Sequence, residues 1–357
     1  MGTEHFAWIN VTATESWREV YISVLWIQVV TSLLSIVGSG SVIGYAVFKN
    51  SVKLPEVRPL FYLTLSDLLL ALCWLVGAVL YRHSCPNNVS CYNLQAVGQM
   101  FYLSTFYYTL NYTWQTYSNM WRRLRNEVYT ISDTECCIGR ITTVLSSVVP
   151  FLFTVPVLIF GNIKQCFRNT NHSCLVLNVG SQITTNPTAN TTNVCRALHF
   201  YTKAIFLSTF FLTVISILVI SGYFYILFRR YQTTAVSLQY KQWAVITVTR
   251  RNLLLFLVIF VLCCLPAVTL AIRTLAYGKG TDEVYKIFYY IQALAAVSQG
   301  FLNCLAYGWT RQMLRCLKQN YFRDVDTQTP LLRSQKKVYA SMQTSTRSIG
   351  PPSVSAL

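Results

Sequence analysis

The sequence predicts an all-α membrane protein, a bundle of seven transmembrane helices with an amphipathic helix after the seventh. Hydrophobic residues make up 53% of the chain and charged residues 11%, whereas soluble proteins have about 25% charged residues. Seven apolar runs are long enough to cross a bilayer as helices. They cover residues 20–48, 60–81, 94–118, 138–160, 197–228, 252–272 and 284–308.

The chain divides around these runs into four parts. Residues 1–19 are polar and are expected to form an extracellular N terminus, and residues 20–308 form the bundle. Beyond it, apolar residues recur with helical spacing at Trp309, Met313 and Leu317, with basic residues between them. This pattern predicts an amphipathic helix over 309–322 that lies on the inner membrane face. Residues 323–357 are rich in Ser and Thr, so we expect a disordered cytoplasmic tail.

The distribution of basic residues predicts the orientation. If the first loop is cytoplasmic, 20 of the 29 Lys and Arg residues fall on the inner side, as the positive-inside rule requires. The net charge of +17 is therefore a sign of topology rather than of nucleic-acid binding. We expect an integral protein of the plasma membrane with its N terminus outside and its C terminus in the cytoplasm.

The glycosylation sequons and the cysteines agree with this orientation. Four sequons lie on the predicted outer side, at Asn10, Asn88, Asn171 and Asn190. Five cysteines lie there too, at Cys85, Cys91, Cys166, Cys174 and Cys195. Five outer thiols permit two disulfides with one cysteine left over, and the sequence leaves their pairing open. The chain is thus expected to be a disulfide-bonded glycoprotein.

A single carboxylate, Asp67, lies within the second run. A mid-bilayer Asp costs roughly 2.5–3.5 kcal/mol on insertion scales, so Asp67 should face the bundle interior. The seventh run carries Gln292, Ser298, Gln299 and Asn303 and is unusually polar. In the sixth run Pro266 removes a backbone hydrogen bond and should kink the helix. We therefore expect Asp67 to meet Asn303, and Ser298 as well, in a hydrated cluster.

Three motifs resemble those of G-protein-coupled receptors. Leu63-Thr64-Leu65-Ser66-Asp67 looks like the second-helix motif, in which the Asp helps to hold a sodium ion or waters. The run 260–266 is similar to the sixth-helix motif, with Cys264 replacing its tryptophan, and 303–307 resembles the seventh-helix motif, with Cys304 replacing its proline. The resemblance implies a sodium ion near Asp67 and a switch cluster. Its expected members are Asp67, Ser298, Asn303, Tyr307, Phe260 and Pro266.

Two departures point to a divergent group. The third helix lacks the acidic-Arg-Tyr motif of the largest receptor class, and Ser41 stands where that class has its Asn. The run 298–303 resembles the seventh helix of cyclic-AMP-receptor-like proteins. The second half, including Cys263-Cys264 and 324–332, resembles the vertebrate transmembrane protein 116 family, which implies an orphan receptor-like protein.

The expected mechanism is a two-state bundle in which an outer ligand favours one arrangement and the inner face then engages a G protein, with cyclic AMP as the expected second messenger. By their position near the outer third, the candidate ligand contacts are Gln99, Tyr102, Arg273, Tyr289 and Tyr290. The basic residues expected to face a heterotrimeric G protein are Arg122, Arg123, Arg125, Arg229, Arg230, Arg250 and Arg251.

Other function classes remain open or are disfavoured. We expect no enzyme and no metal site, because all four histidines lie outside or at a helix end, where they cannot bind zinc within the bundle. A small-solute transporter is one alternative, since intramembrane polar residues can line a path. A second alternative is a seven-span protein that does not couple and acts in trafficking or assembly.

Overall fold

The structure is a computed structural model that describes the backbone of residues 2–50, 57–82, 88–124, 133–169, 189–234, 240–277 and 283–345. Within these ranges, side chains are described for most residues from 19 to 316. The described residues form seven α-helices and one 3-10 turn. They are α1 (Gly2–Phe48), α2 (Arg58–Arg82), α3 (Asn88–Leu124), α4 (Asp133–Ile163), η2 (Cys166–Asn169), α5 (Ala189–Thr234), α6 (Tyr240–Tyr277) and α7 (Glu283–Ser345).

Five of these helices contain segments long and apolar enough to cross a membrane. The segments are Glu19–Phe48, Arg58–Arg82, Ile138–Ile163, Asn193–Ile226 and Ile246–Ala276. The two other helices, α3 and α7, are the ones in which the sequence interleaves amides and hydroxyls with aromatic residues. Such groups lower the hydropathy of a helix and are tolerated where they face other helices. The predicted seven-helix membrane bundle is confirmed.

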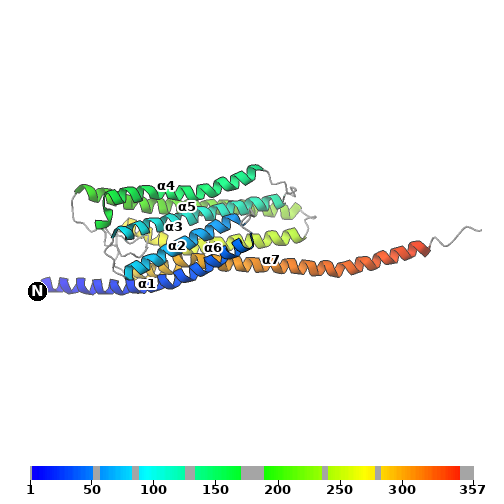
Figure 1. The fold of residues 1–357 in the computed structure, drawn as a ribbon, viewed down its shortest axis with the longest axis horizontal. Coiled ribbons are helices and arrows are strands. Elements are labelled where there is room, and N and C mark those ends of the chain that lie inside the picture. Colours follow the sequence, from blue (N-terminus) through cyan, green and yellow to red (C-terminus); the bar gives the residue numbers. More distant parts are fainter. Residues whose placement is uncertain are drawn as a thin grey trace, which may run out of the picture.

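The helices lie side by side along one long axis, as Figure 1 shows. α3 packs against α2, α4, α5 and α6, whereas α1 packs against α2 and α7. We call the end with Cys91, Cys166 and Cys195 the cysteine end, and the opposite end, where α6 begins, the basic end. The largest apolar core joins α1, α2, α3, α5, α6 and α7 in the half nearer the cysteine end. The central helices are therefore those whose polar residues need partners inside the protein.

The backbone differs from the predicted boundaries at both ends of the chain. α1 begins at Gly2 and passes through the polar residues up to 19, and α7 continues through 309–322 to Ser345. Figure 1 shows both helices extending beyond the bundle at opposite ends. From 309 to 345 the sequence contains no glycine, so the usual C-cap residue that would end a helix is missing. A separate surface helix and an unstructured stretch before residue 345 are not seen in this backbone.

Candidate functional site

Asp67 and Asn303 meet in the interior of the bundle. Asp67 on α2 is 3% exposed, and Asn303 on α7 is also buried. The Asn303 amide nitrogen donates a hydrogen bond to Asp67 Oδ2 at 2.8 Å. The second carboxylate oxygen, Oδ1, has no hydrogen-bond partner among the described residues. A half-paired buried carboxylate is costly to maintain, so this contact is a point at which the bundle can gain stability by rearranging.

Gly300 brings a third helix to this contact. A Cβ atom on Gly300 would meet the hydroxyls of Ser35 and Ser39 on α1 and would lie 3.3 Å from Asp67 Cβ. Gly300 therefore allows α1, α2 and α7 to approach closely. Neither serine hydroxyl has a partner within the described part of the chain. Three unpartnered oxygens thus gather around one glycine, and oxygen donors of this kind suit a hard cation such as sodium or a group of waters.

The other predicted switch residues lie on α6 and α7, outside the hydrogen bond between Asp67 and Asn303. Ser298 donates to the Ala295 carbonyl of its own helix at 3.1 Å and lies beside Cys263 on α6. Tyr307 is half-buried about one turn beyond Asn303 and accepts a hydrogen bond from Arg311 at 3.5 Å. Phe260 and Pro266 are buried on α6. The structure therefore places Asp67 and Asn303 in direct contact, and Ser298 is linked to them through Cys263, which interacts with both Ser298 and Asp67. The remaining residues lie along α6 and α7.

Phe260 belongs to an aromatic cluster that joins α3, α5 and α6. Its ring packs edge-on against Phe106 with centroids 5.3 Å apart and stacks on Phe210 at 6.0 Å. Phe206 contacts both Phe106 and Tyr102. Offset and edge-on pairs of this kind are worth about 0.5–1.5 kcal/mol each beyond their burial. The position of α6 is thus tied to α3 and α5 by ring packing.

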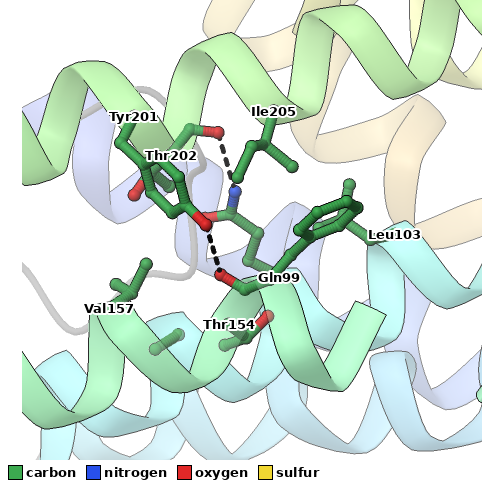
Figure 2. Close-up of a pocket in the computed structure, with 9 residues that line it drawn as sticks. Gln99, Leu103, Thr154, Val157, Tyr201, Thr202 and Ile205 are labelled. Atoms are coloured by element: carbon green, nitrogen blue, oxygen red, sulfur yellow. Dashed lines mark hydrogen bonds between the residues drawn. The ribbon is translucent and has the colours of Figure 1, made fainter. Parts of the chain in front are cut away.

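The predicted ligand residues have different surroundings in the described part of the bundle. Gln99 donates to the Thr202 carbonyl on α5 at 3.1 Å and lines a pocket between α3, α4 and α5, which Figure 2 shows. This pocket holds little more than a water-sized group. Tyr102 packs in the aromatic cluster, whereas Tyr289 packs against Tyr285, with ring centroids 5.1 Å apart. Arg273 and Tyr290 are partly exposed.

Lys203 on α5 was missed by the sequence reasoning. It is 4% exposed, and it and Asp67 are the two charged side chains buried among the described residues. No acidic group pairs with it in those parts of the chain. Lys203 lies three residues before Phe206, so it shares the inward face of α5 on the cysteine-end side of the aromatic cluster. Helical spacing in the predicted fifth span places Lys203 on the same face as Phe206 and Phe210, but which face turns inward is decided by packing.

A second polar contact was also missed, and it lies at the basic end. The Asn252 amide nitrogen on α6 donates to Tyr112 Oη on α3 at 3.0 Å. The hydroxyl of Thr310 on α7 donates to Asn252 Oδ1 at 2.5 Å. One asparagine therefore holds three helices together, and we call Tyr112, Asn252 and Thr310 the α6 latch. Sequence spacing could not show it, because the three residues are far apart in the chain.

Four of the predicted G-protein-facing arginines have described side chains, and these four lie at the basic end. Arg251 lies over the Trp309 ring at 5.9 Å, and Arg229 lies over the Tyr225 ring at 5.5 Å. Arg122 and Arg250 are partly buried. Arg123, Arg125 and Arg230 lie outside the described side chains. Arg311 on α7 donates to the hydroxyl of Tyr45 on α1.

One disulfide resolves part of the open cysteine pairing. Cys166 in η2 bonds to Cys195 in α5 with their Cα atoms 5.6 Å apart. Cys91 at the start of α3 is also disulfide-bonded. Cys85 and Cys174 lie outside the described residues, as do the side chains of the four predicted glycosylation sites, Asn10, Asn88, Asn171 and Asn190. The disulfide between Cys166 and Cys195 connects η2 to α5 at the cysteine end.

The bundle, its apolar spans and its internal polar contacts define a polytopic helical membrane protein in contact with the lipid bilayer. The chain matches the family described as Transmembrane protein 116 over residues 21–341. It therefore belongs to that family, and the resemblance based on its second half is confirmed.

Proposed function

We propose that this protein is a receptor-like signal transducer whose helix bundle has two arrangements. A ligand bound from the cysteine end shifts the balance between them, and the basic end then engages a G protein. The observation that carries the proposal is the buried hydrogen bond of 2.8 Å between Asn303 and Asp67. It joins α2 to α7 through a carboxylate with one unpartnered oxygen among the described residues, so a second arrangement can compete with the first.

The α6 latch supports this proposal at the opposite end. If the basic end opens by movement of α6, Asn252 must release both Tyr112 and Thr310. Pro266 lies about four turns away and lacks the backbone N–H donor of an ordinary helix residue, which gives α6 a point at which to bend. The latch is then the element that the closed arrangement keeps and the open arrangement loses.

Lys203 supports a ligand with an acidic group. A buried ammonium without a counter-ion is unfavourable, and the carboxylate or phosphate of a ligand would supply one. Lys203 lies beside the aromatic cluster that positions α6, so charge pairing there would act directly on α5, α3 and α6. We propose Lys203, in place of the half-exposed Arg273, as the anchor for the ligand.

A sodium ion near Asp67 fits the same scheme. Asp67 Oδ1 and the hydroxyls of Ser35 and Ser39 offer oxygen ligands from two helices. An ion held there would favour the arrangement in which α1, α2 and α7 are closely packed. It would therefore stabilise the closed state.

The test is to release the latch without any ligand. In transfected cells, Asn252→Leu should raise basal signalling, measured as cyclic AMP and G-protein dissociation, because leucine fills similar space but makes neither hydrogen bond. The matched control is Thr269→Val on the same helix, since Thr269 is partly exposed and, among the described residues, bonds to the Leu265 carbonyl of its own helix.

Two results would overturn the proposal. If spin-label distances between α3 and α6 widen in Asn252→Leu and no signal changes, the bundle opens without coupling, as the trafficking alternative expects. Substrate-dependent flux in proteoliposomes that is abolished in Lys203→Met would instead identify a transporter.

A further inference from the structure

One face of α1 is polar where it is most deeply buried. Gln28, Ser32, Ser35 and Ser39 recur at intervals of four, three and four residues, so they lie on one side of the helix. All four are at most 1% exposed. Their side-chain polar atoms have no hydrogen-bond partner within the described ranges. Because buried polar groups are almost always hydrogen-bonded, such a stripe indicates partners other than protein atoms.

The register between α1 and α7 shows what faces this stripe. Near the cysteine end, Tyr21 lies close enough to Tyr285 for their phenol groups to interact, and Tyr285 is 264 positions later in the chain. Between four and five helical turns further along, a Cβ on Gly38 would lie 3.1 Å from Phe301 Cα, 263 positions later. The two helices therefore keep nearly the same register between these contacts. With the same offset, Gln28 lies level with Gln292.

α2 contributes a third group to this level. Tyr81 interacts with Tyr21 near one end of the shared interface, and Asp67 lies beside Gly300 near the other. Trp74 is seven residues from each, two turns along the same face of α2. It is 1% exposed, and its indole Nε1 has no partner among the described residues. Trp74 therefore belongs to the layer of Gln28 and Gln292.

This layer carries five unpartnered polar atoms from three helices. Gln28 and Gln292 are 0% exposed, and both amide atoms of each lack a partner in the described part of the chain. The amides offer donors and acceptors, the indole offers a donor, and none of the three residues is charged. The chemistry suits a small uncharged molecule that both donates and accepts hydrogen bonds, and water is the molecule of this kind that fills buried polar sites.

We propose that Gln28, Trp74 and Gln292 bind ordered water, and that this water continues past Ser32 and Ser35 to Asp67 as a hydrated seam between α1, α2 and α7. The seam joins the buried carboxylate to the layer of Gln28, Trp74 and Gln292 through a continuous row of polar groups and water. The seam is inferred from helix packing and unpartnered polar groups, so it does not depend on whether the protein couples to a G protein.

Radiolytic footprinting tests the seam directly. X-rays generate hydroxyl radicals from water in place, so a side chain that touches ordered water is oxidised even when it is closed to bulk solvent. In the full-length protein in nanodiscs, mass spectrometry should find Trp74 oxidised despite its burial. The double variant Gln28→Leu with Gln292→Leu should lose most of that oxidation, because leucines displace the water.

The matched control is Gln99→Leu. It removes an amide that lines the pocket between α3, α4 and α5, and it should leave Trp74 oxidation unchanged. Protection of Trp74 in the unmodified protein would overturn the proposal, because the two amides would then pair with each other in a dry interface. Oxidation that persists in the double leucine variant would also overturn it. The result for the unmodified protein stands even if the double variant fails to fold.

Discussion

At the scale of single residues, Asp67 and Asn303 show how a membrane protein accommodates a buried charge. The carboxylate lies inside the bundle, where it receives one hydrogen bond of 2.8 Å from an amide. Its other oxygen has no partner among the described residues. A charge held in this way contributes little to stability, which is consistent with the proposed second arrangement or bound ion at this position.

Asp67→Asn should raise the free energy of unfolding, and Asn303→Ala should lower it. An amide at 67 can still accept from Asn303 without the penalty of a buried charge, whereas alanine at 303 leaves the carboxylate unpaired. Each change is expected to be about 1–3 kcal/mol. Thermal unfolding in detergent, with and without sodium, measures both. Shifts of the same sign in the two variants would contradict this account of the pair.

The sequence predicted this pair because both residues are costly in a bilayer and lie in runs that must span it. It did not predict Lys203 or Asn252. Lys203 lies in a strongly apolar run near its outer end, and Asn252 lies at the start of one, so both can be read as membrane-interface residues. Their burial depends on which face each helix turns to its neighbours.

At the scale of elements, Gly38 in the small-residue segment 38–44 of α1 decides how closely α7 can approach. A Cβ on Gly38 would lie 3.1 Å from the Phe301 backbone, whereas Gly40 and Gly44 have nothing within 4 Å of such an atom. The sequence alone does not distinguish these three glycines, but of the three only Gly38 lies at the contact with α7. No contact in the structure accounts for Gly40 or Gly44.

Gly38→Ala should therefore destabilise the protein and Gly40→Ala should not. The new methyl group at 38 meets backbone rather than a flexible side chain, so α1 and α7 must separate, at an expected cost of about 1–3 kcal/mol. Alanine at 40 should be neutral or stabilise by up to about 1 kcal/mol, because alanine is the better helix former. Unfolding temperatures of the two variants measure this, and equal shifts would refute the close contact.

At the scale of the whole molecule, the two ends of the bundle differ in chemistry. The cysteine end is held by the disulfide between Cys166 and Cys195. The basic end is held by hydrogen bonds and by arginines over aromatic rings, as for Arg251 over Trp309. Covalent bonds fix one end and reversible contacts close the other, which is the arrangement expected if movement occurs at the basic end.

The orientation of the chain can be tested by glycosylation. If the cysteine end faces outward, endoglycosidase should shift the protein on a gel, and Asn10→Gln, Asn88→Gln, Asn171→Gln and Asn190→Gln should each remove one step. Asn111→Gln is the matched control, because Asn111 opens a sequon but is buried and donates to Thr143 at 3.2 Å. Complete insensitivity to the enzyme would reverse the predicted topology.

The sequence by itself determined the membrane class, the seven helices and the burial of Asp67. These follow from composition, run length and the cost of placing charge in lipid, which act on each segment separately. Tertiary structure alone decided which partners those residues meet, including the α6 latch, the buried Lys203 and the layer of Gln28, Trp74 and Gln292. Such contacts depend on the register and rotation of helices far apart in the chain, and these are set when the bundle packs.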